Sequence, residues 1–391
     1  MGLSAGKPVD AGHRHAADRG NDRGQAPPLL RRRAIARRRG PRASGRVSAR
    51  LVLLVALFVA ALSVGAGAGT LRLATWHLEL DRDGPGLLLR DLRRGDDPRI
   101  KAIAGLIAAV APDVLVVQGV DYDHGLRALS ALRDRIAEDG PYYSHLFALR
   151  PNTGWPTGLD MDGDGRRGGP RDAQGYGTFS GQGGMAILSR YPLDREGARD
   201  FSAMLWRDLP GALLPRWPDG RPFPSQEAQA VQRLSSVGHW VVPLRLPSGS
   251  VSLMTFHATT PVFDGEEDRN GRRNHDEIRF WQRYLDGAFG DPPARRFVVI
   301  GDANLDPNAG EGRRGAIRAL LADPRLRDPL PGRATVAWDE TGPLRVSYIL
   351  PSADLAVTGA GILWPPEDAP DRAEAEAAGP HRLIWVDLTL D

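Results

Sequence analysis

One apolar run that stops at a short polar group most constrains what this chain can fold into. Residues 298–300 are branched and apolar, and Gly301 ends the run. A run of this kind predicts a buried strand. Asp302 and Asn304 follow with one residue between them, so both side chains can point to the same side. Because ligands usually bind at strand ends in mixed α/β folds, the stretch predicts a site at the edge of a sheet.

The two polar residues suit one kind of chemistry. The Asp302 carboxylate can hold a divalent cation or orient water, and the Asn304 amide can donate to a phosphoryl oxygen. The alternative is a polar turn in which Asp302 caps the segment that follows.

Apolar residues along the rest of the chain recur with the periods of strands and helices in turn. Asp97 followed by Pro98 predicts a helix start, and two alternating segments around 247–249 predict a hairpin. This order predicts a layered α/β or α+β domain with mixed sheets. Strands are expected at 71–77, 114–118, 143–149, 183–189, 239–246, 251–257, 298–301, 345–350 and 383–390, and helices at 97–110, 125–138 and 315–321 and around 278–285.

Length and cysteine content set outer limits. The chain has 391 residues, of which 41% are hydrophobic, which is enough for one large domain or two smaller ones. It has no cysteine, so disulfides and thiolate metal sites are excluded.

The basic charge is confined to the first fifty residues. Residues 1–50 carry 13 Lys and Arg against three Asp and Glu, whereas the rest carries 38 against 45. A mildly acidic body argues against a broad cationic face for duplex DNA. We interpret residues 1–50 as a basic, disordered leader, and residues 70–391 as the folded domain.

The segment after the leader predicts export. Residues 51–64 are apolar and uncharged, and small residues follow at 65–69. A basic flank, a short apolar run and small residues are typical of a secretory signal, and the run is short for a membrane span. Residues 51–68 are therefore a signal peptide, with an uncleaved membrane anchor or a buried strand as alternatives. We expect a periplasmic or extracellular protein that contacts a membrane only through this segment.

A Gly-, Asp- and Arg-rich loop at 150–182 contains a second candidate metal site. Asp160, Asp162 and Asp164 alternate and are followed by glycine, as at the start of an EF-hand calcium loop. The closing glutamate of such a loop is missing, and Asp172 stands one position beyond its place. The pattern predicts Ca²⁺ binding, with a solvated acidic turn as the alternative.

Seven short motifs follow one another in a fixed order at 75–77, 112–121, 181–190, 255–257, 301–304, 345–350 and 379–381. Together they resemble the endonuclease/exonuclease/phosphatase superfamily, the group of deoxyribonuclease I, exonuclease III-like repair nucleases, inositol polyphosphate phosphatases and sphingomyelinases. The resemblance implies a deoxyribonuclease I-like four-layer α/β sandwich, with two mixed sheets packed face to face between helices.

The resemblance also implies a mechanism. In this family a Mg²⁺-type cation is held by an Asn, a Glu and acids of the later motifs, water attacks phosphorus in line, and a His–Asp pair supplies the base. Residue by residue, the retained catalytic positions are His257, Asp302, Asn304 and His381.

Four positions depart from the family pattern. His77 stands in the Asn position, Gly119 in the metal Glu position, and Ser347 and Pro380 in two Asp positions. Gly119 has no ligand atom, and Ser347 leaves its histidine without the carboxylate that fixes the tautomer.

New metal ligands can compensate for the losses. Asp121 lies two residues after Gly119, and His77 offers a nitrogen, so the candidate metal ligands are Asp302, Asp121 and His77. Nitrogen suits Mn²⁺ or Zn²⁺ better than Mg²⁺.

These observations predict an exported, metal-dependent phosphoester (phosphodiester) hydrolase with weak or altered activity. Its substrate would be a phosphorylated small molecule or a nucleic acid. The alternative is an inactive family member that binds phosphorylated ligands or a protein partner. Basic residues at 269–275 can meet substrate phosphates near His257, or can form a solvated helix start.

Overall fold

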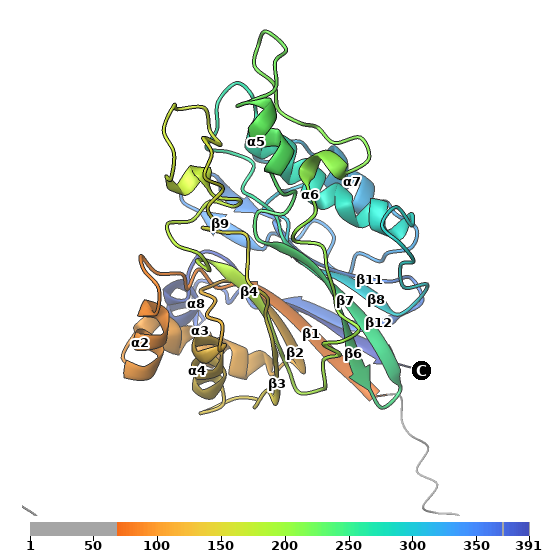
Figure 1. Cartoon of the computed structure of the whole chain (residues 1–391). Coiled ribbons are helices and arrows are strands. Elements are labelled where there is room, and N and C mark those ends of the chain that lie inside the picture. Colours follow the sequence, from red (N-terminus) through yellow and green to blue (C-terminus); the bar gives the residue numbers. More distant parts are fainter. Residues whose placement is uncertain (1–68, 370, 391) are drawn as a thin grey trace, which may run out of the picture. The chain divides into compact units, whose positions relative to one another are not determined.

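Two mixed β-sheets form the centre of the computed structural model, which describes residues 69–369 and 371–390 (Figure 1). The predicted leader and signal segment, 1–50 and 51–68, lie outside the described residues. Among the described residues, no helix is long and apolar enough to cross a membrane.

The first sheet has six strands in the order β12-β13-β1-β2-β4-β3. β1 pairs with β2 in parallel and with β13 antiparallel, so its inner residues are buried on both faces. The strands are β12 (Ala356–Ile362), β13 (Ile384–Leu390), β1 (Gly69–His77), β2 (Val114–Val120), β4 (Gly184–Ser189) and β3 (His145–Phe147).

The second sheet has five strands in the order β11-β8-β7-β6-β5. The predicted hairpin is present as β6 and β7, and the apolar run at 298–300 lies within β8, which is buried along its whole length. The strands are β11 (Ser347–Pro351), β8 (Phe297–Asp302), β7 (Gly249–His257), β6 (Gly238–Leu246) and β5 (Arg199–Asp200), and a separate ribbon joins β9 (Val336–Trp338) to β10 (Gly342–Leu344).

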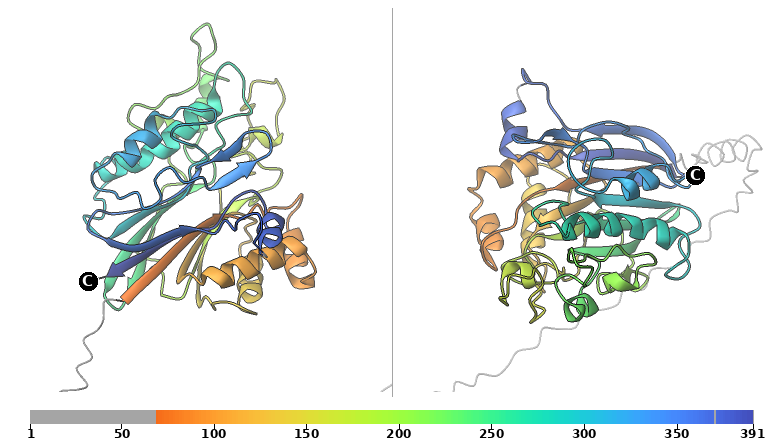
Figure 2. Two further views of the ribbon diagram at one scale, coloured as in Figure 1. Left: turned by 180° about the vertical axis from the view of Figure 1, so that it is seen from behind. Right: turned by 90° about the horizontal axis from the view of Figure 1, so that it is seen from above.

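Three apolar clusters hold the layers together. The middle cluster packs the sheets face to face through Val116, Val386, Leu253 and Ile300 among others. The outer clusters pack helices on the far face of each sheet, and Figure 2 shows the two helical layers on opposite sides. This arrangement confirms the predicted four-layer α/β sandwich.

The helices begin and end where local chemistry allows. The Asp97 side chain accepts hydrogen bonds from the Arg99 and Ile100 amides, as the predicted cap requires. One layer contains α2 (Leu87–Arg94), α3 (Pro98–Val110), α4 (Arg127–Ile136) and α8 (Arg372–Ala377), and the other contains α6 (Arg269–Leu285) and α7 (Gly315–Leu321); α5 (Gln226–Val231) is a short helix in the irregular stretch before β6.

The sequence analysis did not predict α2, α5, α8, β9, β10 or β12. α5, α8, β9 and β10 have six residues or fewer, and such short elements depend on tertiary packing because local propensity alone leaves them marginal. β12 also contains two glycines and lies at a sheet edge with no fully buried residue, so it lacks an apolar alternation.

The strand ends bring one polar row together. His257 of β7 lies opposite Asp302 of β8, and Asp302 lies opposite Ser347 of β11. Gly301 makes the close approach of β7 and β8 possible, since its φ is 153° and a Cβ there would collide with the Phe256 carbonyl oxygen. The three side chains therefore share one face at the same edge of the sheet.

Candidate active site

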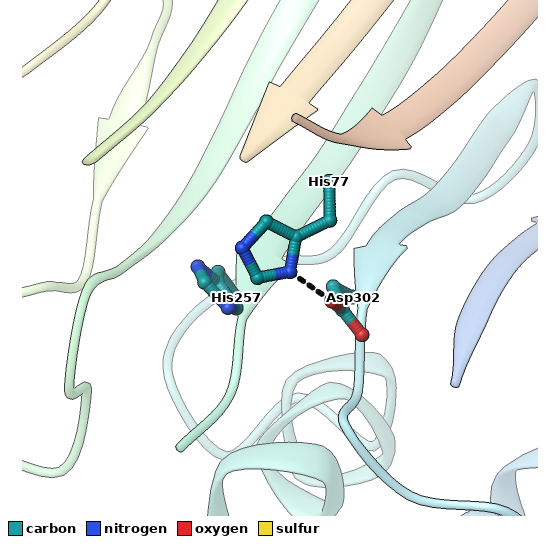
Figure 3. A group of neighbouring side chains, drawn as sticks. All are labelled: His77, His257 and Asp302. Carbon is teal, nitrogen blue, oxygen red and sulfur yellow. Dashed lines mark hydrogen bonds and ion pairs between the residues drawn. The ribbon is translucent and has the colours of Figure 1, made fainter. Parts of the chain in front are cut away.

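Three histidines and one aspartate meet where strand ends of the two sheets converge. Figure 3 shows His77, from the end of β1, pointing toward Asp302 and His257 of the other sheet. The His77 ring centroid lies 4.7 Å from that of His257 and 4.4 Å from that of His381. The structure thus brings together residues that are up to 304 positions apart in the chain.

Among the described residues, Asp302 is the carboxylate that groups with His77 and His257, and it is fully buried. Its Oδ2 lies 2.8 Å from Nδ1 of His77 and 4.0 Å from Nδ1 of His381, and its Oδ1 accepts a hydrogen bond from the backbone N–H of Asn304 at 2.9 Å. A buried carboxylate is costly unless it is paired and hydrogen-bonded. His77 and the Asn304 amide supply that pairing.

The pKa values of the four side chains in the cluster shift in different directions. Burial by itself would raise the pKa of Asp302, but the hydrogen bond and charge of His77 outweigh it and hold the pKa at about 2. Burial by itself would lower the pKa of His77, but Asp302 and Glu79 outweigh it, so that pKa is raised. Burial, together with the charge of His77, lowers the pKa of both His257 and His381 to about 3.

Within the described part of the chain, His257 and His381 each have a buried ring nitrogen without a hydrogen-bond partner. Nε2 of His257 lies 3.2 Å from the Asn304 amide nitrogen, which also donates to the Ala258 carbonyl oxygen. Nδ1 of His257 and Nδ1 of His381 are buried and unpaired. Buried polar atoms are normally satisfied, so these two nitrogens indicate a missing partner.

The cluster fits a divalent cation. One ligand atom from each of His77, His257 and Asp302 lies within 4.8 Å of the others. Imidazole nitrogens with one carboxylate are the donors that Zn²⁺ and Mn²⁺ accept more readily than Mg²⁺ does. His77, His257 and Asp302 are therefore suited to hold such an ion, and His381 is not in this group among the described residues.

Comparison with known proteins shows the family of this chain. The family model described as Endonuclease/Exonuclease/phosphatase family matches residues 82–380. The chain belongs to this family. Members of the family generally depend on a divalent metal. The matched range excludes His77 and His381, so the place of these two histidines in the centre rests on the geometry above.

Solved structures support the fold. The chain covers 72% of an endonuclease/exonuclease/phosphatase from Beutenbergia cavernae DSM 12333, with 82% of this chain covered, 19% identity and a TM-score of 0.50. Sphingomyelinase C from Streptomyces griseocarneus (15% identity, 82% and 99% covered, TM-score 0.45) and the human Nocturnin catalytic domain (16%, 84% and 96%, 0.45) are more distant. No curated protein sequence matches the chain significantly.

The substitution at the metal Glu position is coupled to the one at the Asn position. Gly119 has a φ of +69° and lies at an irregularity in the β2–β4 pairing. A Cβ at this position would lie 2.7 Å from Cδ2 of His77 and 2.9 Å from the Glu79 amide nitrogen, closer than real Cβ atoms approach. The His77 ring therefore fills the space that a side chain at position 119 would need.

The two lost aspartates have different surroundings. Ser347 is buried and its Oγ has no partner, so nothing replaces the missing carboxylate in the polar row. Pro380 precedes His381, whose carbonyl accepts the Trp76 indole N–H at 3.0 Å. The Trp338 ring stands edge-on to the His381 ring at 5.3 Å, so aromatic packing orients this histidine.

Asp121 is engaged elsewhere. Its Oδ2 accepts the Arg82 amide at 3.1 Å and its Oδ1 accepts the Gly183 amide at 3.1 Å. Burial raises its pKa to about 6. Among the described residues it does not join the group of His77, His257 and Asp302, although the sequence made it a candidate ligand.

Sequence reasoning missed Glu79. Its Oε1 lies 3.8 Å from Nε2 of His381, and its Oε2 accepts a hydrogen bond from Arg99 at 2.6 Å. Glu79 thus brings a negative charge to the cluster near the position where Gly119 has none. Its place two residues after His77, beyond the same strand end, is the sequence signal that could have identified it.

The acidic loop partly assembles as predicted. Asp160, Asp162 and Asp172 bring oxygens within 4.8 Å of one another, and Asp164 is not in this group. The Asp160 carboxylate also accepts the Gly163 amide at 2.6 Å. Burial, with the charges of neighbouring aspartates, raises the pKa of Asp162, as expected where carboxylates are held together without a cation.

Acidification should destabilise the metal-free protein between pH 6.5 and about 4. The folded state keeps His257 and His381 neutral down to about pH 3, whereas the unfolded chain protonates both below 6.5. The unfolded state then binds more protons, so each group lowers the free energy of unfolding by up to ~1.4 kcal/mol per pH unit. His77 has a raised pKa, is protonated in both states there, and adds no slope.

Urea denaturation at several pH values, with a chelator present, measures this slope. His381→Gln should reduce it by one proton, and His124→Gln, at an exposed position, should leave it unchanged. An equal slope in all three proteins would contradict the prediction.

Calcium should raise the melting temperature by binding the group of Asp160, Asp162 and Asp172. At a free concentration of 100 times Kd, mass action adds ~2.7 kcal/mol. Asp162→Ala should abolish the gain, and Asp164→Ala, in the same loop but outside the group, should retain most of it. Titration calorimetry without a Ca²⁺ heat would leave only a solvated acidic turn.

Proposed function

We propose that this chain is a phosphoester hydrolase with weak activity, and that its metal is held by histidines. Three observations support the proposal: the membership of the endonuclease/exonuclease/phosphatase family, the ionised Asp302, and the unpaired nitrogens of His257 and His381 beside it. The last observation carries the choice of a nitrogen-preferring ion such as Zn²⁺ or Mn²⁺.

Each residue of the centre has a distinct role in the proposed function. Asp302, ionised at neutral pH, orients His77 and balances positive charge in the centre. His77, His257 and Asp302 would hold the cation, which supplies Lewis acidity toward water and the phosphoryl oxygens. Asn304 fixes the His257 ring through its amide.

Weak activity follows from the basicity and burial of the site. A histidine with a pKa of about 3 accepts a proton poorly near pH 7, and Ser347, which lies opposite Asp302, supplies no carboxylate to the polar row. Asp302 and His381 are almost fully buried, and the His77 side chain is 15% exposed. Losses of such supporting groups typically cost ~10–100-fold each in affinity or activity.

Hydrolysis of bis(4-nitrophenyl) phosphate tests the proposal after chelation and reloading with single metals. Zn²⁺ or Mn²⁺ should restore slow turnover, and Mg²⁺ should restore less. Asp302→Ala should abolish turnover, and His77→Asn should shift the preference toward Mg²⁺ because it exchanges a nitrogen ligand for an oxygen. His124→Asn is the matched control and should change neither property.

The same assay separates the outcomes. Binding of Zn²⁺ without any turnover would support the alternative, an inactive member that binds phosphorylated ligands or a partner. Fast turnover with Mg²⁺ that survives Asp302→Ala would contradict the proposed centre. Restoring Gly119→Glu, Ser347→Asp and Pro380→Asp should raise Mg²⁺-dependent turnover only together with His77→Asn, because the His77 ring occupies the space. The left-handed backbone of Gly119 and the Glu79 backbone nitrogen should keep that gain small.

We also propose that the protein is exported, as the composition of residues 51–68 suggests. Cell fractionation should find a mature chain that begins near residues 67–70 outside the cytoplasm. An uncleaved anchor would give the full-length chain in the membrane fraction. Full-length protein in the cytoplasm would contradict the proposal.

A further inference from the structure

A pocket of about 450 Å³ lies beside the end of β7. Thr259 lines it and is two residues after His257, so the pocket begins within roughly 7 Å of that histidine measured between Cα atoms. The pocket has the size of small-molecule sites. The loop 150–182, the segment after β7 and the start of α6 supply most of its wall, including Arg171, Tyr176, Phe263, Arg269, Asn270 and Arg273.

Three guanidinium groups line the pocket without a carboxylate in contact. Among the described residues, none of Arg171, Arg269 and Arg273 forms an ion pair within 4.0 Å. They donate instead to backbone carbonyls: Arg171 to Phe263, Arg269 to Met161, and Arg273 to Leu234, Gln174, Arg233 and Ser235. Asp162 and Glu277 act on Arg269 and Arg273 only at longer range.

These guanidinium groups keep donors for a ligand. Nε and Nη2 of Arg269 and Nη1 of Arg273 donate to no group of the described chain, and none of these atoms is buried and unpaired. Burial lowers the pKa of Arg269, and lowers that of Arg273 to about 10, so both positive charges are held in a poorly solvated place. An anion is the ligand that such a place favours.

Two exposed aromatic rings stand at the same pocket. Phe263 is 76% exposed and Tyr176 is 69% exposed, and both line it. Phe263 has a φ of +69°, which is strained for a bulky residue and persists only where the surroundings impose it. The Arg171 guanidinium at its carbonyl, and the Asn270 amide at the Val262 carbonyl, hold this conformation. An exposed aromatic ring on a strained backbone that its neighbours hold in place indicates a surface on which a ligand ring can stack.

We propose that this pocket is a subsite for a phosphate joined to a planar ring, in a ligand of mononucleotide size. The guanidinium groups of Arg171, Arg269 and Arg273 bind the phosphate, and Phe263 or Tyr176 stacks on the ring. The subsite rests on the proposed hydrolase function, because it would hold the part of the substrate next to the scissile bond. The mildly acidic body favours a free nucleotide over a nucleic acid strand.

Binding of AMP to the full chain in the presence of a chelator tests the subsite without involving hydrolysis. AMP should bind more tightly than ribose 5-phosphate, which lacks the ring, and than adenosine, which lacks the phosphate. Arg171→Ala should weaken AMP by roughly tenfold or more. Phe263→Ala should weaken AMP by roughly fivefold or more and leave ribose 5-phosphate unchanged.

Two matched controls accompany these variants. Arg167→Ala removes the same charge from an exposed position of the same loop, and Tyr142→Ala removes an exposed ring remote from the pocket lining. Both should bind AMP like the unmodified chain. A single-stranded oligo(dA) carries the same phosphate and ring, and affinity for it well above that for AMP would overturn the free nucleotide as ligand.

Two results would overturn the subsite itself. One is AMP binding that survives both Arg171→Ala and Phe263→Ala but is lost in His257→Gln, which would place the ligand in the histidine centre. The other is equal affinity for AMP and ribose 5-phosphate. Failure of hydrolysis with every metal would leave AMP binding intact, so the two proposals fail separately.

Discussion

The hydrogen bond between Nδ1 of His77 and Oδ2 of Asp302 is the interaction on which the rest of the centre depends. It joins strand ends of two different sheets, β1 and β8, across the edge of the sandwich. Asp302 is fully buried, so its charge requires a partner at this distance. The positive charge that His77 supplies also helps to keep His257 and His381 neutral. One ion pair therefore sets the protonation of all three rings, and a cation held by His77, His257 and Asp302, as proposed above, would have to displace the His77 proton.

The departures from the family pattern are coupled by volume. His77 occupies the space beside Gly119, and Gly119 adopts a left-handed backbone that a side chain would strain. The loss of a side-chain oxygen at Gly119 of β2 and the presence of a ring nitrogen at His77 of β1 are therefore one linked change in the centre. Glu79 returns a negative charge near the same place, within 3.8 Å of His381. This exchange of donors is the basis of the proposal above that the centre would take an ion that accepts nitrogen ligands.

The loop 150–182 contributes to both the acidic group and the pocket beside β7. It brings Asp160, Asp162 and Asp172 together, and it also contributes Arg171 and Tyr176 to the pocket beside β7. Arg269, at the start of α6, donates to the Met161 carbonyl and so fastens the acidic part of the loop to the pocket wall. Cation binding in the loop and anion binding in the pocket would therefore act on neighbouring groups. Arg171 of the pocket directly precedes Asp172 of the acidic group, and Arg269 contacts Met161 and, through charge, Asp162.

The sequence by itself determined the strands and the order of the motifs. The run before Gly301, the cap at Asp97 and the hairpin around 247–249 are local patterns, and burial leaves its period in them. The family, the four layers and the residues His257, Asp302 and Asn304 followed from that order. Only the tertiary structure decided which side chains meet. His77 and Asp302 are 225 positions apart. Glu79 joins from a loop and Trp338 from the three-residue strand β9, both too short to show a period, and Asp121 accepts from backbone amides. Such contacts depend on how two sheets converge, and no local pattern encodes that distance.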